Sequence, residues 1–256
     1  MSVNGFGYDF ALVKLSGGTG ATAWAKGFGS TAYDNATAVA VERSTGDVVI
    51  TGKAGGPINL GGGLTSNGGV FVSKYSGVDG SYKWAKVLAA NTGNGIAVDP
   101  TTGNVFVTGG FTGSVDFGGG AITTPWQQNG GMFLASYGPS GNYLWAKACG
   151  ANGDAGNAVS VDGSGNVAFT GTAAGAIDFA NTGIPTQADG FIVASFTTSG
   201  SYRWDKRGGT SWGNGIACDS LGHLLTTGSF DYTVDFGGNS LAAAGMPDGF
   251  VAQYTK

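Results

Sequence analysis

The sequence predicts an all-β fold built from a tandem repeat of about 60 residues, and three observations carry this prediction. Tryptophan recurs in one context, with a lysine two residues later, at intervals of 60, 61 and 59 residues: Trp24, Trp84, Trp145 and Trp204. Downstream of each lie short runs rich in Val, Ile, Phe, Tyr and Thr, bounded by Gly, Asn, Asp or Ser, which is typical of strands joined by turns. No window of 11 or more residues combines helical periodicity with helix caps.

Composition agrees with many turns between short strands. Glycine accounts for 51 of the 256 residues, without the three-residue period of collagen. Hydrophobic residues reach 41%, so the chain is not a disordered polar tract. The length allows a sizeable core.

Each repeat predicts four strands. The first alternates apolar and small residues and ends in an acid, and the second ends in Thr-Gly. The third is β-branched and aromatic, and the fourth carries the tryptophan. In chain order the first strands are 38–42, 96–99, 159–162 and 216–219, the second 47–52, 104–109, 166–171 and 223–228, and the third 70–75, 132–137, 191–196 and 250–254, with 10–15 as a fifth copy of the third.

Tandem four-stranded antiparallel units usually pack radially as the blades of a β-propeller. A lone sheet of this size cannot cover both of its faces, but neighbouring sheets can cover one another. The four tryptophans are bulky enough to fill the layer between blades, so we interpret them as core residues.

The motifs Leu144-Trp-Ala-Lys147, Gly95-Ile-Ala-Val-Asp99, Asn104-Val-Phe-Val-Thr-Gly109 and Val115-Asp-Phe-Gly118 resemble those of the bacterial SBBP repeat proteins, named for seven-bladed propellers. The resemblance covers the chain from about Tyr8 to Tyr254 and implies a propeller fold in surface or secreted proteins of myxobacteria and their relatives. The first two strands also look like NHL-type propellers. That likeness implies that strands 38–42, 95–99, 158–162 and 215–219 line a central channel. The chain departs from the family in having four units.

We therefore expect one domain over residues 1–256, with repeat units at about 8–53, 70–109, 131–171 and 189–228 and a terminal strand at 249–254. The chain begins with a third and a fourth strand, 10–15 and 22–27, and ends with the first three. Joining these N- and C-terminal strands would close a propeller of four four-stranded blades. Strands 10–15 and 250–254 would compete for one place, and the surplus strand predicts homo-oligomers through strand addition.

The sequence lacks the groups that enzymes need. His223 is the sole histidine and lies in a hairpin turn, and Cys149 and Cys218 are the sole cysteines. One histidine with two dispersed cysteines makes no zinc pattern. No nucleophile elbow or phosphate-binding loop precedes a helix. We expect no enzyme activity and no cofactor. Buried free thiols are our interpretation of the cysteines, although a disulfide stays open.

Charge and hydropathy narrow the partners. The chain has 12 Lys and Arg against 16 Asp and Glu, for a net charge of −4, with no basic cluster. Nucleic acid is therefore not an expected partner. No apolar run is long enough to span a bilayer, and no signal peptide is visible at the start of this chain.

Repeated carboxylates are weak calcium candidates. Asp116, Asp178 and Asp235 lie in the glycine-rich segment that follows the second strand, and Asn59 takes their place in the first repeat. Oxygen ligands on such a loop suit Ca²⁺, but no copy has three closely spaced acids. The competing interpretation is that these side chains tie the loop together, and we expect no metal site.

Two sets of residues are candidates for ligand binding. Amides precede the first strand at Asn94, Asn157 and Asn214; they form a polar ring at one mouth of the channel or satisfy backbone groups there. Four aromatic residues break the repeat in loop settings: Trp126, Trp212, Tyr33 and Tyr232. Aromatic rings beside polar neighbours suit sugar stacking, and packing over the blade ends is the alternative.

We expect a non-enzymatic, extracellular or cell-surface binding module of a bacterial secreted protein. Its expected ligand is a glycan or surface polysaccharide, with a role in carbohydrate binding or adhesion. The alternative is a structural protein that self-assembles into oligomers or filaments through its surplus strand. The identity of the ligand is not encoded in any motif.

Overall fold

The computed structural model describes residues 7–65, 67–123, 131–151, 153–179, 186–219, 221–238 and 240–255, and every regular element in them is a strand. The first strands of the repeats are β3 (Asn35–Val41), β7 (Thr92–Val98), β13 (Ala155–Val161) and β17 (Ser211–Cys218). The second strands are β4 (Val48–Ala54), β8 (Val105–Phe111), β14 (Val167–Ile177) and β18 (Leu224–Phe230).

The third strands are β1 (Phe10–Leu15), β5 (Gly69–Tyr75), β11 (Gly131–Tyr137), β15 (Thr186–Phe196) and β21 (Asp248–Tyr254). The fourth strands, which carry the tryptophans, are β2 (Thr22–Phe28), β6 (Tyr82–Leu88), β12 (Tyr143–Cys149) and β16 (Tyr202–Gly208). Two small hairpins complete the described strands: β9 (Ser114–Asp116) with β10 (Ala121–Thr123), and β19 (Thr233–Asp235) with β20 (Ser240–Ala242).

These strands form antiparallel sheets that follow the repeat. Sheet 1 has the order β3-β4-β5-β6, sheet 2 the order β7-β8-β11-β12, and sheet 3 the order β13-β14-β15-β16. Sheet 4 has three strands, β17-β18-β21, and β1 and β2 form a separate hairpin. The prediction of an all-β fold is confirmed, and sheets 1 to 3 have the predicted four strands.

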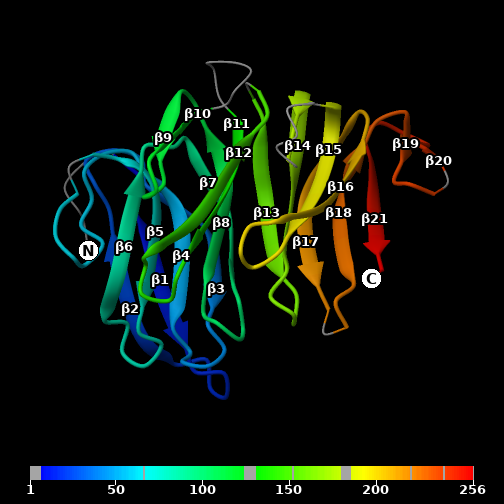
Figure 1. Ribbon diagram of the computed structural model, residues 1–256. Helices are drawn as coiled ribbons and strands as arrows, with labels where there is room; N and C mark the ends of the chain where they lie inside the picture. Colours follow the sequence, from blue (N-terminus) through cyan, green and yellow to red (C-terminus); the bar gives the residue numbers. More distant parts are fainter. Residues whose placement is uncertain are drawn as a thin grey trace.

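The sheets stand side by side in chain order, from the β1–β2 hairpin at one end to sheet 4 at the other (Figure 1). Their first strands are neighbours, because β3 contacts β7, β7 contacts β13, and β13 contacts β17. Each sheet therefore has one face turned toward the next sheet, which we call its forward face, and one turned toward the preceding sheet, its backward face.

The hydrophobic core lies in the layers between the sheets. Between sheets 1 and 2, for example, buried Val72 and Trp84 pack with Phe133 and Tyr137. Three indole N–H groups donate across such a layer to a backbone carbonyl in the third-to-fourth turn of the next unit: Trp24 to Gly77 at 3.4 Å, Trp84 to Pro139 at 2.9 Å and Trp145 to Thr198 at 2.8 Å. The tryptophans thus pack between sheets, as the repeat predicts.

The predicted joining of the chain ends is not what the described strands do. β1 pairs with β2, while the place beside β18 is taken by β21, and β1 and β21 lie on opposite sides of the molecule (Figure 1). Packing explains the outcome of the competition. β21 brings Phe250, whose ring lies 5.3 Å from that of Phe191 and 4.4 Å from that of Phe236. In the same place β1 would bring Ala11.

A glycine before each amide position lets neighbouring sheets approach closely. A Cβ atom on Gly93, Gly156 or Gly213 would overlap the hydroxyl of a buried threonine in the preceding sheet. That threonine is held in place, since Thr108 Oγ1, for example, donates to the carbonyl of Phe133 at 2.6 Å. Sheet 1 has Ala36 where the other sheets have this glycine. The backward face of sheet 1 is covered instead by the β1–β2 hairpin, which provides no threonine at this place.

Replacing Phe250 by alanine tests how β21 holds its place. Loss of the buried ring should lower the free energy of unfolding by about 3–5 kcal/mol, because it removes apolar burial and leaves a cavity. Val251, the next residue, is 73% exposed, and Val251→Ala should change stability by less than about 0.5 kcal/mol. Urea unfolding of both variants measures the difference, and equal effects would contradict the packing argument.

Candidate functional site

A groove runs along the first strands of all four sheets. It has a volume of about 410 Å³, within the range of roughly 300–1,000 Å³ typical of small-molecule sites. β3, β7, β13 and β17 each lie at the end of their sheet and so have one edge that no strand of their own sheet covers. The lining residues are Ala40, Val41, Arg43, Ile96, Ala97, Val98, Pro100, Val159, Ser160, Val161, Gly163, Cys218 and Asp219.

The groove wall is aliphatic with few polar groups. Ser160 accepts a hydrogen bond from the backbone N–H of Cys218 at 3.0 Å, which joins β13 to β17. Arg43 is exposed, and Asp219 lies at the end of β17. This arrangement offers apolar contact and a few directed hydrogen bonds, but no nucleophile paired with a base lines it.

The predicted amides bridge neighbouring sheets. Asn94 Nδ2 donates to the carbonyl of Gly156 at 3.0 Å, and Asn157 Nδ2 donates to that of Gly213 at 2.8 Å. Thr37 makes the same bridge from sheet 1 to Gly93. Asn214 has no following sheet in the described part of the chain and is exposed. Of the two interpretations of these amides, Asn94 and Asn157 fit the one in which they satisfy backbone groups.

The aromatic candidates are not brought together. Trp126 lies outside the described residues. Tyr33 is 66% exposed before β3, and its ring lies 5.4 Å from that of Tyr8. Trp212 in β17 and Tyr232 in the turn after β18 are exposed at the other end of the array. Tyr33, Trp212 and Tyr232 do not line the groove.

The repeated carboxylates tie their own loops. Asp116 Oδ1 accepts the N–H groups of Gly118 and Gly120 at 2.7 and 3.0 Å. Asp235 accepts those of two glycines in the same way, and Asp178 lies in the corresponding segment after β14. No three His, Cys, Asp or Glu side chains gather as metal ligands within the described ranges.

The histidine and the cysteines have local roles. His223 Nδ1 lies 2.8 Å from Asp219 Oδ2 in the hairpin between β17 and β18. Cys149 and Cys218 are free thiols. Burial raises the pKa of both thiols above the ordinary value, so neither is activated as a thiolate.

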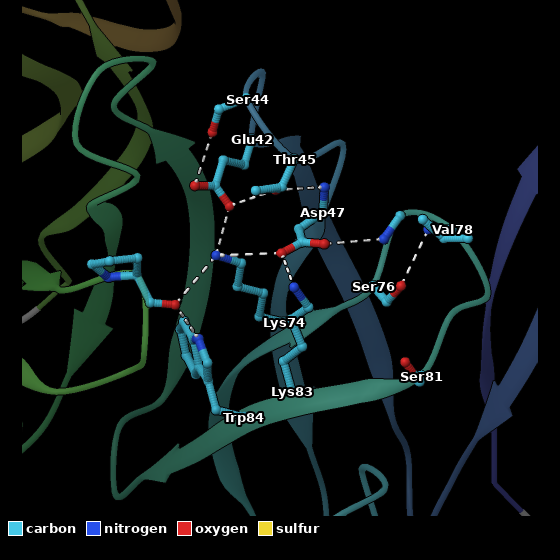
Figure 2. A network of polar contacts seen from close by, with 12 residues as sticks. Glu42, Ser44, Thr45, Asp47, Lys74, Ser76, Val78, Ser81, Lys83 and Trp84 are labelled. Atoms are coloured by element: carbon cyan, nitrogen blue, oxygen red, sulfur yellow. Dashed lines mark hydrogen bonds and ion pairs between the residues drawn. The ribbon is translucent and has the colours of Figure 1, made fainter.

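A buried cluster of charges in sheet 1 was not expected from the sequence (Figure 2). Lys74 Nζ lies 2.7 Å from Glu42 Oε2 and 3.7 Å from Asp47 Oδ2, and Lys83 Nζ lies 2.5 Å from the same Asp47 oxygen. Lys74 also donates to the carbonyl of Pro139 at 3.2 Å, which links sheet 1 to sheet 2. Two cations balance two anions, so the cluster is neutral.

Hydrogen bonds decide the ionisation of the two carboxyls. Burial would raise both pKa values, but the bonds from Lys74 and Thr45 to Glu42, and from Lys83 and the Gly77 N–H to Asp47, outweigh it and lower both pKa values. The sequence did contain a signal, since Asp47 stands where the other repeats have Asn104, Asn166 and His223, whereas the lysine at the place of Lys74 recurs as Lys14 in β1. Because Glu42, Asp47 and Lys74 are buried and Lys83 lies at the exposed rim, we assign the cluster a structural role.

Comparison with known proteins adds little to this description. No protein-family model matches the chain, and no curated protein sequence matches it. One solved structure to which it is similar is a protein of unknown function from Bacteroides caccae, with a TM-score of 0.47 and 10% identity. That match covers 92% of this chain and 73% of the other. The described part of the chain forms no helix that could cross a bilayer.

The amide bridges predict that Asn157 and Asn214, which hold equivalent positions in the repeat, contribute differently to the free energy of unfolding. Asn157→Ala removes the bond to Gly213 and should lower the free energy of unfolding by about 1 kcal/mol. Asn214→Ala is the matched control, since this exposed amide bridges to no described sheet, and should be close to neutral. Chemical denaturation gives both values, and a larger loss for Asn214→Ala would refute the bridging role.

The charge cluster predicts a dependence of stability on pH. Carboxyls whose pKa values are lowered by folding contribute fully above their ordinary values of 4.5 and 3.8, and this contribution is lost as the pH falls toward the folded values. The free energy of unfolding should therefore fall between pH 6 and pH 3.

Lys74→Met should reduce this fall and lower the free energy of unfolding by about 3–5 kcal/mol at pH 7, because it leaves the buried Glu42 carboxylate without its cation. Lys53→Met, at an exposed position in β4, is the control. Urea titrations across this pH range check both expectations, and identical pH profiles for the wild type and Lys74→Met would contradict them.

Proposed function

We propose that the chain is a propeller-type repeat protein that acts as a non-enzymatic binding module outside the cell or at its surface, with a glycan as ligand. The observation that carries this proposal is the single groove to which the first strands of all four sheets contribute. Sheets that stand face to face with their first strands adjacent are consistent with blades around a common axis. The SBBP-type sequence motifs support the same arrangement.

The groove suits a ligand that is apolar on one face and rich in hydroxyl groups at its rim. Ile96, Val98 and Val161 offer aliphatic surface. The open edges of the first strands offer backbone donors and acceptors, and Arg43 and Asp219 add one charge of each sign. Sugars combine C–H faces with hydroxyls that both donate and accept, so this mixed wall matches them better than it matches a strongly charged ligand.

The exposed aromatic residues are a separate surface. Tyr33 lies before the first strand of sheet 1, whereas Trp212 lies in β17 of sheet 4 and Tyr232 in the turn that follows β18. A single small sugar cannot contact both sets, since sheets 2 and 3 stand between them. We therefore assign the proposed glycan site to the groove rather than to these rings.

Glycan-array screening followed by calorimetry tests the proposal. Val41 lines the groove and is 57% exposed, so Val41→Trp should narrow the groove without disturbing the core and reduce glycan affinity at least tenfold. Tyr232→Ala, away from the groove, should leave affinity unchanged. Absence of binding to any glycan would refute the ligand class. Loss of binding in Tyr232→Ala alone would move the site to the aromatic surface.

A further inference from the structure

The polar side chains on the wall of the groove are not equally free to bind a ligand. The carboxylate of Asp219 is already used in the hairpin between β17 and β18. Its Oδ1 accepts the backbone N–H groups of Leu221 and His223, each at 2.9 Å, and its Oδ2 lies 2.8 Å from Nδ1 of His223. Ser160 Oγ accepts the backbone N–H of Cys218. Asp219 and Ser160 therefore both have partners inside the protein.

Arg43 differs from them. Its side chain is exposed and lines the groove on the side of sheet 1. Within the described ranges, no carboxylate or carbonyl bonds to its guanidinium group. Arg203, by contrast, donates to Ser195 Oγ at 3.0 Å. Arg207 donates to Asp205 Oδ2 at 2.7 Å. Arg43 therefore brings a positive charge and a fork of N–H donors to the groove.

The repeat places Arg43 at a position that belongs to the groove. This position follows the acid at the end of the first strand. In sheets 2 and 3 it is held by Pro100 and Gly163, which also line the groove. Both are uncharged, as is Ser220 at the same position of the fourth repeat, which lies outside the described residues. Arg43 is thus a departure from the repeat that lies on the groove itself.

The nearby acids do not neutralise this charge. Glu42 precedes Arg43 in the sequence, but its carboxylate is buried and lies 2.7 Å from Lys74 Nζ. Asp219 belongs to sheet 4, and β7 and β13 stand between its strand and β3. A ligand that lies along the groove therefore meets an unpaired positive charge at the sheet 1 side and an uncharged wall beyond it.

The strand edges add backbone groups to that wall. The N–H of Asp99 donates to the carbonyl of Asn104 at 2.8 Å, so it points into its own sheet. Because successive residues of an antiparallel strand alternate in direction, the N–H and C=O of Val98 point to the open edge. Val161 holds the equivalent place in sheet 3, and both valines line the groove. These edges suit hydroxyl groups, which both donate and accept.

We propose that the glycan bound in the groove is acidic, and that the guanidinium of Arg43 binds the carboxylate of a uronic acid unit. This inference rests on the proposed function and names the class of sugar that the groove selects. A guanidinium matches a carboxylate through a pair of parallel N–H···O bonds. The same placement orients the ligand, with its acidic unit at sheet 1 and away from the carboxylate of Asp219.

Uronic acid oligosaccharides and their methyl esters are the probes. Tetramers of galacturonic, glucuronic and mannuronic acid are titrated into the full chain by calorimetry, each beside its methyl ester, which keeps the sugar skeleton and removes the charge. At least one acid should bind about ten- to a hundredfold more tightly than its ester, because hydrogen bonds to charged groups are the stronger ones.

Two results would overturn the inference and leave the proposed function standing. One is an ester that binds as tightly as its acid. The other is failure of all three acids on a chain that binds neutral glycans on the array. Absence of binding to any glycan, in contrast, refutes the proposed function itself.

Variants assign the preference to one side chain. Arg43→Gln should abolish the preference for acid over ester and change the affinity for the ester less than about twofold. Arg43→Lys should keep part of the preference, because lysine retains the charge but lacks the planar fork. Lys53→Gln removes the same charge at an exposed position of β4 outside the groove lining and should keep the whole preference.

The exposure of Arg43 makes its variants compatible with folding, which circular dichroism checks. If Arg43→Gln weakened acid and ester equally, Arg43 would only shape the groove, and the inference would fail. An equal loss of preference in Lys53→Gln would show a general effect of net charge and would also overturn it.

Discussion

The structure depends on the layer between one sheet and the next. No sheet here could bury both of its faces alone, and the apolar residues of the third strands β5, β11 and β15 are buried because the neighbouring sheets cover them. The indole N–H groups fix the spacing of this layer, because each donates to a carbonyl in the turn of the following unit. The amides of Asn94 and Asn157 do the same near the groove. In each of these bonds the donor residue precedes the acceptor residue in the sequence.

The repeat could be predicted from the sequence because it is recorded in residue types at fixed spacing. Strand number, strand order within a repeat and the burial of the tryptophans all follow from that pattern. The closure of the ends could not be predicted in this way, because β1 and β21 carry the same pattern. What separates them is the size of one side chain, Phe250 against Ala11, and the neighbours that this side chain meets.

The candidate site was predicted less well, for two physical reasons. Tyr33, Trp212 and Tyr232 were chosen because they depart from the repeat. Such a departure does not indicate which sheets are neighbours, and in the structure Tyr33 lies at one end of the array of sheets and the other two residues at the opposite end. The groove is lined by residues that keep the repeat, such as Val98 and Val161. The charge cluster depends on Asp47, which replaces the Asn104, Asn166 and His223 of the other repeats, so a search for an added acid in a repeat that also carries lysines would have found it.

Ala36 has a consequence for how such a chain can change in length. A gene duplication that copies the segment around Gly93 or Gly156 adds a sheet whose backward face fits the threonine before it, so the array can grow from within. A copy of the segment around Ala36 placed later in the chain would push a methyl group into that threonine and interrupt the stack. The Ala36 methyl group thus distinguishes sheet 1, whose backward face is covered by the β1–β2 hairpin through Trp24, from the three later sheets that carry the glycine, so the repeats are not interchangeable along the array.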